Sequence, residues 1–275
     1  ALVKGIEAPV ATTATDVAKN IAASMLSGER KAILLGNAAA HHPKASSLLA
    51  LANWIGLHTG ASVGYLTEAG NTVGAQWASA QPAKNGLNAG QMLAGDLKAV
   101  ILLNNEPEFD SAAGAKAKAV LGQAQMVVSM NPFRANMDFC DVILPISPFT
   151  ETSGSFVNAE GRLQSFHAVV KPLGETRPAW KVLRVLANML DLPGFDFDES
   201  TDVLSKLTGQ SNALSSIPAD KLGNLSSEAF DMSAATTRPV TATIYQVDGI
   251  VRRASSLQMT ADAKMPTTSA DEVNA

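Results

Sequence analysis

Short, continuous apolar runs, each followed by a polar turn, recur through the first half of this 275-residue chain. The runs are residues 32–35, 99–103, 126–130 and 142–144. Four or five apolar residues in a row, without polar alternation, are typical of a parallel strand that is buried on both faces. Helical patterns at 15–28, 43–55 and 111–121 stand between the runs. The alternation predicts βαβ units and hence an α/β fold, a Rossmann-like parallel sheet flanked by helices.

After residue 150 the pattern changes to a hairpin and two helices. Residues 155–157 and 162–166 flank Asn158-Ala159-Glu160-Gly161, and a glycine that closes a short connection predicts a β-hairpin with positive φ at Gly161. Helices are predicted at 178–190 and 200–207, and the Ser-, Thr- and Asn-rich remainder predicts a partly irregular tail. We therefore expect a linker (1–11), an α/β sheet domain (12–150), a hairpin and helix extension packed on it (151–207) and an irregular C-terminal segment (208–275).

Composition excludes several classes of protein. Hydrophobic residues make up 46% and charged residues 17% of the chain, which is too apolar for disorder along its whole length. The net charge of −4 disfavours a dedicated nucleic-acid binder, which usually carries a basic face. Residues 45–67 carry no charge, but Asn53, His58 and three glycines interrupt them, so we expect a buried helix rather than a membrane span. The chain is expected to be soluble and intracellular, without its own anchor.

A single cysteine, Cys140, limits the redox chemistry that the chain itself can carry. One thiol cannot form an internal disulfide or supply a cysteine-rich iron–sulfur site. No basic residue or histidine flanks Cys140, so a small buried side chain is expected rather than a reactive thiol. Any iron–sulfur cluster must therefore lie outside this chain.

Local motifs give few candidate sites. Residues 60–64 match the G-x-S-x-G pattern of a nucleophile elbow, but a helix is expected before them and a strand after them, the reverse of what that mechanism needs. His41 and His42 follow a predicted strand, where capping the next helix or lining a groove is favoured over a metal site. The chain contains neither the glycine-rich fingerprint of dinucleotide-binding folds nor that of P-loop folds. Ligands are expected instead at the carboxyl ends of the strands, residues 36–42, 104–110, 131–136 and 145–151.

Residues 151–162 form the densest group of polar side chains. Glu151 and Glu160 lie there with Arg162, Asn158 and three hydroxyl side chains. Two carboxylates can act as general acid and general base, as they do in glycosidases. The alternative is a structural polar network at the start of a hairpin, with Arg162 held by a carboxylate. The local residues do not single out an acid and a base, so both interpretations stay open.

Three motifs between residues 131 and 190 resemble the molybdopterin oxidoreductase superfamily in their order and spacing. They are Cys140-Asp141-Val142-Ile143-Leu144-Pro145, the segment from Glu151 to Gln164 and the segment from Pro172 to Trp180. Asn71 with Gly74, and residues 104–107, resemble weaker upstream elements. Ser155 and Cys140 depart mildly from the pattern, where Thr and Ala are common. The resemblance covers roughly residues 30–260 and implies the fold of that superfamily.

Within the superfamily, the chain resembles the large iron–sulfur subunit of bacterial NADH–quinone oxidoreductase, respiratory complex I. Residues 178–186 and 250–258 carry this finer likeness. It implies the later part of a subunit whose iron–sulfur clusters are bound in a missing N-terminal part, and a fold in which a molybdopterin cofactor is not expected. No catalytic residue and no metal ligand is expected in this chain. The positions that match the family, which would line a vestigial pocket or brace the fold, are Asn71, Asn104, Glu151, Gly154, Asn158, Glu160 and Arg162.

The resemblance thus implies a structural, non-catalytic module of the peripheral electron-transfer arm of a proton-translocating complex. Its partners would be the other peripheral-arm subunits, on the cytoplasmic side of the bacterial inner membrane and without direct membrane insertion. Two alternatives stay open. One is a fragment of a true molybdopterin-dependent oxidoreductase of the formate-dehydrogenase type, and the other is a stand-alone module that binds a small ligand.

Overall fold

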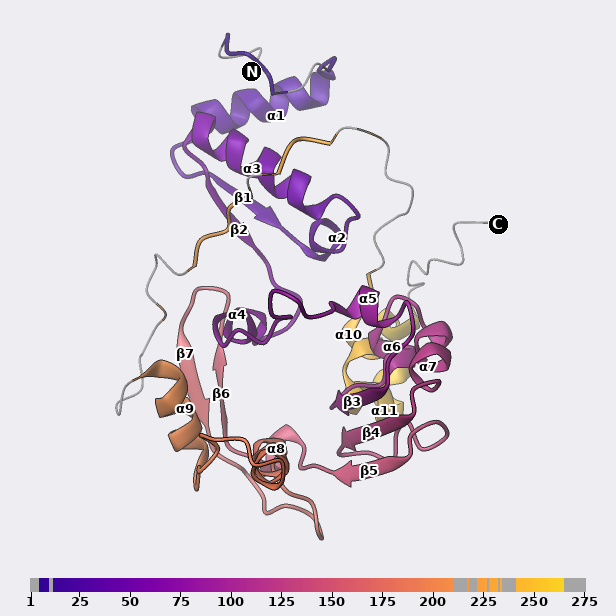
Figure 1. The fold of residues 1–275 in the computed structure, drawn as a ribbon. Coiled ribbons are helices and arrows are strands. Elements are labelled where there is room, and N and C mark those ends of the chain that lie inside the picture. Colours follow the sequence, from indigo (N-terminus) through magenta and orange to yellow (C-terminus); the bar gives the residue numbers. More distant parts are fainter. Residues whose placement is uncertain are drawn as a thin grey trace. The chain divides into compact units, whose positions relative to one another are not determined.

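The computed structural model describes residues 5–9, 12–209, 217, 222–226, 228–231, 233 and 241–264. These residues form two compact units, which are described separately (Figure 1). The first unit contains the residues up to Ala69 together with those of 219–242, and the second contains 70–218 together with 243–264. Both units combine parallel strands with helices, which confirms the expected mixed α/β class.

A two-stranded parallel sheet with its helices makes up the first unit. The elements are α1 (Asp16–Ser27), β1 (Ala32–Leu35), α2 (Asn37–Ala40), α3 (Ala45–Thr59) and β2 (Ser62–Tyr65). The strands pair in register from Ala32 with Ser62 to Leu35 with Tyr65. The Thr15 hydroxyl accepts a hydrogen bond from the Ala18 N–H at 3.2 Å, so the first helix begins where the sequence predicts it.

A later segment of the chain is fixed to the start of α3 in the same unit. The Lys44 ammonium lies 3.0 Å from the Asp231 carboxylate, and the Ser47 hydroxyl donates to the Ala229 carbonyl at 3.2 Å. Hydrogen bonds from Ser233 and from Lys44 lower the pKa of Asp231 to about 2. Asp231 is therefore charged at neutral pH and holds the described residues of 229–233 against α3.

The second unit contains a three-stranded parallel sheet in the order β3-β4-β5 (Figure 1). Its first elements are α4 (Thr72–Trp77), α5 (Ala89–Met92), β3 (Ala99–Leu103), α6 (Pro107–Asp110), α7 (Ala115–Leu121), β4 (Met126–Asn131) and β5 (Val142–Pro145). All four apolar runs of the sequence are strands. The core of this sheet is made by Val100, Leu102, Leu121 and Val127.

One predicted helix is shorter than the sequence indicates. The alanine-rich pattern predicts a helix from Ser111, whereas α7 begins at Ala115 and the separate helix α6 ends at Asp110. Gly114 interrupts the helical path, because its φ of 54° and ψ of −135° are outside the helical region. The prediction over 111–114 was wrong because alanine content does not reveal how a glycine within the pattern is folded.

The predicted hairpin is present in the second unit. After a 3₁₀ turn, η2 (Phe149–Glu151), strands β6 (Gly154–Val157) and β7 (Leu163–Phe166) pair antiparallel, and α8 (Ala179–Met189) and α9 (Ser200–Thr208) follow. Gly161 has a φ of 81°, which confirms the positive φ predicted for it. The Asn158 side chain closes the turn by accepting from the N–H groups of Glu160 (3.0 Å) and Arg162 (2.9 Å).

We expect Gly161→Val to destabilise the second unit by about 1–2 kcal/mol, since a residue with a Cβ pays that penalty in the left-handed region. The Gly161 carbonyl also accepts from the Ile217 N–H at 2.7 Å, so a shifted turn would lose a second contact. Urea denaturation measures the change, and Glu160→Ala at the same turn serves as the control. An unchanged transition midpoint for Gly161→Val would show that the turn does not require positive φ.

Short helices occupy part of the segment predicted to be irregular. They are α10 (Ile244–Val247), α11 (Gly249–Arg253), α12 (Ser255–Gln258) and the 3₁₀ turn η4 (Asp262–Lys264). The prediction for 210–216, 218–221, 227, 232, 234–240 and 265–275 lies outside the described residues. Among the helices that the structure describes, none is both long enough and apolar enough to cross a membrane.

Candidate functional site

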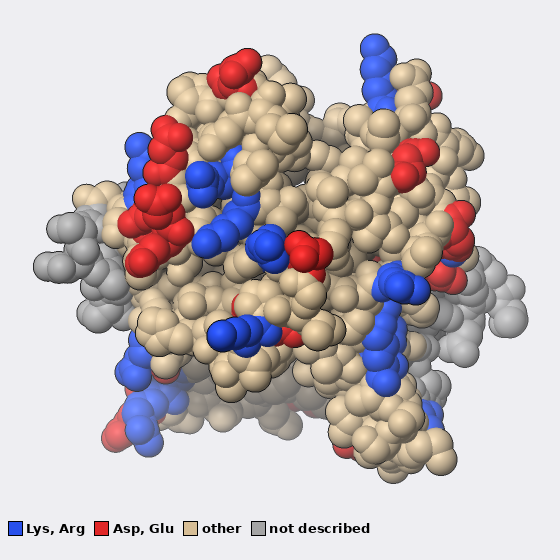
Figure 2. Space-filling view, turned by 90° about the horizontal axis from the view of Figure 1, so that it is seen from below, with Lys and Arg blue, Asp and Glu red and all other residues tan. Residues whose placement is uncertain are grey.

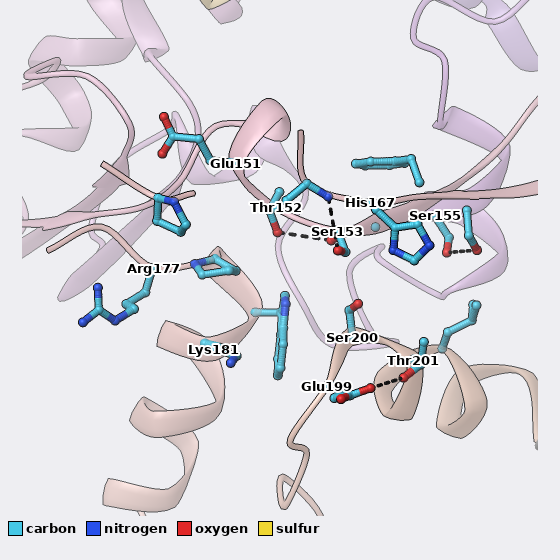
Figure 3. Close-up of a pocket in the computed structure, with 18 of the residues that line it drawn as sticks. Glu151, Thr152, Ser153, Ser155, His167, Arg177, Lys181, Glu199, Ser200 and Thr201 are labelled. Carbon is cyan, nitrogen blue, oxygen red and sulfur yellow. Dashed lines mark hydrogen bonds between the residues drawn. The ribbon is translucent and has the colours of Figure 1, made fainter. Parts of the chain in front are cut away.

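A pocket of about 720 Å³ lies in the second unit between the hairpin and helices α8 and α9 (Figure 3). Residues 151–155 and 165–168 of the hairpin line one part of it. The lining is completed by residues of the connection and the first turn of α8, and by residues at the start of α9. They are Lys171, Pro172, Arg177, Pro178, Trp180, Lys181, Asp198, Glu199, Ser200, Thr201 and Leu204. Small-molecule sites in proteins have volumes of roughly 300–1,000 Å³, so this pocket has the size of a site for one small molecule.

Hydrogen bonds to η2 hold the connection that follows β7 beside the pocket. The Glu151 carboxylate accepts from the Leu173 N–H at 2.9 Å, and the Thr150 carbonyl accepts from the Val169 N–H at 2.9 Å. At the start of β6, a Cβ on Gly154 would lie 2.8 Å from the Phe166 ring, so the glycine leaves room for that ring to lie over the strand. One side-chain carboxylate and one main-chain carbonyl of η2 thereby hold this part of the pocket wall in place.

The pocket is lined by charged side chains of both signs. Lys171, Arg177 and Lys181 belong to the lining, and the Lys181 ammonium lies 5.2 Å from the centre of the Trp180 ring. Figure 3 shows Arg177 and Lys181 on one side, with Glu199, Ser200 and Thr201 across from them. The Glu199 carboxylate accepts from the Thr201 hydroxyl at 3.3 Å. The pocket therefore offers both donors and acceptors to a bound molecule.

The pocket does not have the ligands of a metal centre. In the part of the chain that the structure describes, no three His, Cys, Asp or Glu side chains gather closely enough to hold a metal ion. On the face drawn in Figure 2, the described lysines and arginines are interspersed with aspartates and glutamates, and most of the surface is uncharged. The chemistry that the pocket supports is thus hydrogen bonding and ion pairing with an organic ligand.

Two of the predicted site residues line this pocket, and three lie in or next to the hairpin turn. Glu151 and Gly154 belong to the pocket. Asn158 forms the turn, while Glu160 and Arg162 lie beside it. The hydrogen bonds of the segment are those of a turn and do not bring the two carboxylates together.

Asn71 and Asn104 lie in other parts of the second unit. The Asn71 side-chain oxygen accepts from the Val157 N–H at 2.8 Å and so connects the start of α4 with β6. Asn104 follows β3 with a φ of 49°, and its N–H donates to the Met130 carbonyl at 2.7 Å. Neither residue lines the pocket.

The carboxyl end of β3, where a ligand is expected, is covered by α11 of the chain itself. Glu106 is 7% exposed, and its carboxylate lies 3.1 Å from Arg252 and 2.8 Å from Arg253. Arg252 also lies 3.3 Å from Asp110. Burial on its own would raise the pKa of Glu106, but its hydrogen bonds and ion pairs with Arg253 and Arg252 outweigh this and hold that pKa below its ordinary value.

Aromatic rings complete this ion cluster. The Arg252 guanidinium lies 4.4 Å from the centre of the Phe109 ring, and the Arg253 guanidinium lies 4.1 Å from that of Phe133. The two arginines were not among the predicted site residues. Their adjacency on a short helix offered one signal, but only the fold shows that both reach the same carboxylate.

The remaining candidates have structural contacts. His41 lies 2.9 Å from the Glu68 carboxylate, and the ring of His42 accepts from the Lys44 N–H at 3.0 Å next to the start of α3. Helix α3 precedes Ser62 and β2 begins at it, so the elbow pattern has the predicted reverse order. Burial raises the pKa of the Cys140 thiol, as expected for an unreactive cysteine.

Comparison with known proteins found one matching family model and several similar proteins. A sequence model of the molybdopterin oxidoreductase family matches residues 12–189. A Staphylococcus aureus (strain bovine RF122 / ET3-1) protein, whose name assigns it to the formate dehydrogenases, is 40% identical over 88 residues, which are 30% of this chain and 9% of that protein. A Bacillus subtilis (strain 168) protein named as an oxidoreductase is 26% identical over 163 residues, 58% of this chain and 16% of that protein.

Two consequences follow from these matches. The matched residues span between 9% and 16% of the length of the two relatives, so the chain corresponds to a small share of each. The expectation that a molybdopterin cofactor is absent was wrong, because the family whose model matches implies a molybdopterin-type cofactor. That expectation came from the finer likeness to a complex I subunit.

Proposed function

Because the chain belongs to the molybdopterin oxidoreductase family, we propose that it is part of a molybdopterin-dependent oxidoreductase of the formate-dehydrogenase type. The family match over residues 12–189 carries this proposal. The name of the Staphylococcus aureus relative supports formate as the substrate. Since the matched residues span at most 16% of the relatives above, the proposed activity is that of a whole protein to which this chain contributes a part.

This proposal corresponds to the alternative of a true molybdopterin-dependent oxidoreductase, which the sequence left open. It replaces the interpretation of the chain as a structural module of complex I. Neither of the two relatives described above is named as a subunit of complex I. Iron–sulfur clusters in another part of the protein, electron-transfer partner subunits and a position at the cytoplasmic side of the membrane stay predictions. None of the three is needed for the family assignment.

The residues of the pocket suit a molybdopterin-type cofactor, which carries a phosphate and a nitrogen-rich ring. Lys171, Arg177 and Lys181 offer positive charge for a phosphate. The hydroxyls of Ser153 and Ser200, which also line the pocket, offer hydrogen bonds to a ring. The cofactor would supply the redox-active metal, and these residues of the chain would bind and orient it.

Cofactor content tests the proposal. The full-length protein that contains this chain, purified from its natural source without oxygen, is analysed for molybdenum, tungsten and pterin, and for formate-dependent reduction of a dye. We expect stoichiometric metal, a released pterin and formate-dependent activity. Absence of both metal and pterin would contradict the proposal and would favour the interpretation of the chain as a non-catalytic structural module. Metal and pterin without oxidation of formate would contradict only the substrate.

A further inference from the structure

The carboxyl end of β3 holds the two arginines of α11 in a site of matching shape and charge. The two carboxylate oxygens of Glu106 lie 2.8 and 2.9 Å from the two terminal nitrogens of Arg253, a bidentate geometry that a lysine cannot form. Arg252 pairs with Glu106 at 3.1 Å and with Asp110 at 3.3 Å, and an aromatic ring lies beside each guanidinium. The site therefore suits a pair of adjacent arginines better than a pair of lysines.

The acidic side of this site is held by contacts of its own. The Asp110 carboxylate accepts from the Glu106 N–H at 2.7 Å, so the two acidic residues are fixed to each other at α6. The Phe133 N–H donates to the Asn131 side chain at 2.9 Å, which fixes the backbone of Phe133 at the end of β4. Neither contact involves α11, whose Arg253 lies 147 positions from Glu106. The contacts that shape the site thus come from β3, α6 and β4, independently of the arginines.

Charge rather than apolar burial attaches the helices that carry the arginines. Figure 1 shows α10 and α11 next to α6 and β3. Within the described residues 241–264, α10, α11 and α12 have no fully buried residue, and Ile244, Ile250 and Leu257 are 41–61% exposed. Most of the stability of a helix in a protein comes from packing of its apolar face. A segment with so little apolar packing is held chiefly by its two arginines.

The same helices have hydrogen bonds among themselves. The Asp248 side chain caps α11 by accepting from the N–H groups of Ile250 (2.9 Å) and Val251 (2.8 Å). The Gln258 side chain of α12 donates to the carbonyls of Tyr245 in α10 and Val251 in α11, both at 3.0 Å. One side-chain amide thus joins all three helices, so we expect them to open as one piece rather than separately.

We propose that the carboxyl end of β3 is a binding site for a pair of adjacent arginines, which residues 243–260 occupy reversibly while the sheet stays folded. Residues 243–260 are called the clasp, and the site consists of Glu106, Phe109, Asp110 and Phe133. The ligand class is a short helical segment with two neighbouring arginines, and the chain supplies its own. Because ligands of parallel sheets bind at the carboxyl ends of the strands, the docked clasp closes this end and its release opens it. The inference is independent of the proposed function, because it involves no cofactor.

A fluorescent peptide with the sequence of the clasp tests the site in the 275-residue chain. Arg252→Gln together with Arg253→Gln removes the chain's own arginines from the site, and anisotropy measures binding of the peptide. We expect the peptide to bind this double variant. A peptide with glutamine at both arginine positions should bind at least about tenfold more weakly, because charged hydrogen bonds are lost. The wild-type chain should bind the arginine peptide at least about tenfold more weakly than the double variant, since its own clasp fills the site.

Glu106 and Glu108 offer a matched pair of further substitutions. In the double variant, Glu106→Gln should abolish peptide binding, whereas Glu108→Gln should leave it unchanged, because Glu108 pairs with Lys118 outside the site. Circular dichroism checks the folding of each variant. If the variant with Glu106→Gln does not fold, the two peptides on the double variant still test the site. No binding to the folded double variant, or equal binding of the two peptides, would overturn the binding site.

Amide hydrogen exchange of the wild-type chain tests the release of the clasp and needs no substitution. In low concentrations of urea, the amides of α11 and α12 should exchange with a weaker dependence on urea than those of β4, because release of the clasp exposes little apolar surface. An equal dependence on urea in α12 and β4 would show that the clasp leaves only when the whole unit unfolds. That result would overturn the reversible occupation of the site.

Discussion

Replacing Glu106 by glutamine should lower the free energy of unfolding of the second unit by about 3 kcal/mol, the usual effect of removing one partner from a buried ion pair. The glutamine keeps the shape of the side chain and removes its charge. Among the described carboxylates, Arg252, whose side chain is 13% exposed, then keeps Asp110 at 3.3 Å, and Arg253 loses its ion pair. For a domain of this size, the melting temperature should fall by about 6–12 °C.

The same substitution should loosen the helices that the arginines hold. Because Arg252 and Arg253 lie on α11, loss of Glu106 is expected to speed amide hydrogen exchange over Ile244–Gln258 more than in β3 or β4. Glu108→Gln, in α6 and two residues after Glu106, is the matched control, because Glu108 is 43% exposed and lies 3.5 Å from Lys118. Equal exchange in the two variants would show that the cluster does not anchor the helices.

Acid should reproduce the effect in the wild-type chain. The pKa of Glu106 is lower in the folded state than its ordinary value of 4.5, so the carboxylate stabilises the fold above that pH. This contribution is lost as the pH falls through the folded-state pKa. The difference in stability between wild type and Glu106→Gln should therefore be constant at neutral pH and shrink below pH 4.5. A difference that stays constant into strong acid would exclude the charge of Glu106 as its source.

The helices and strands could be predicted from the sequence because each depends on residues that are close together in the chain. The apolar run at 99–103 is β3, the short connection closed by Gly161 is a hairpin turn, and Thr15 caps the start of α1. In each case the physical cause lies in neighbouring residues: a run of apolar side chains, a positive φ, or a hydroxyl beside free N–H groups. The expected burial of 99–103 on both faces was wrong, because Val100 and Leu102 are buried while Ile101 and Leu103, on the other face, are exposed. Gly114 shows the limit, since its backbone conformation depends on the contacts of α6 and α7.

The candidate site was harder to predict because it depends on segments far apart in the chain. Glu106 and Arg253 are 147 positions apart, and Asn71 and Val157 are 86 positions apart. No periodicity shows which distant residues meet. The motif from Glu151 to Arg162 contains residues from two different places in the fold. Glu151 and Gly154 line the pocket, whereas Glu160 and Arg162 lie at the hairpin turn. Lys181 and Asp198, which give the pocket its charge, lie outside that motif.

Asn71 depends on the glycine three residues after it. Its side-chain oxygen accepts from the N–H of Val157, a residue that is 2% exposed, so the bond satisfies a donor that water does not reach. A Cβ added to Gly74 would lie 2.1 Å from that same oxygen, and the other near atoms also belong to Asn71. The absence of a side chain at Gly74 is therefore what leaves room for Asn71 to reach β6.

This dependence predicts that Gly74→Ala changes the stability of the second unit in opposite directions in the wild-type chain and in the Asn71→Ala variant. Asn71→Ala should destabilise the second unit by about 1–3 kcal/mol, because the buried N–H loses its acceptor. Gly74→Ala alone displaces the Asn71 side chain and loses the same bond, offset in part by the better helix propensity of alanine, about 1 kcal/mol. In the Asn71→Ala background no amide remains to be displaced, so Gly74→Ala should stabilise the unit by up to about 1 kcal/mol. Urea denaturation of the four proteins gives the coupling energy. Equal effects of Gly74→Ala in both backgrounds would mean that Asn71 does not need the space, and the connection between α4 and the hairpin would then have another cause.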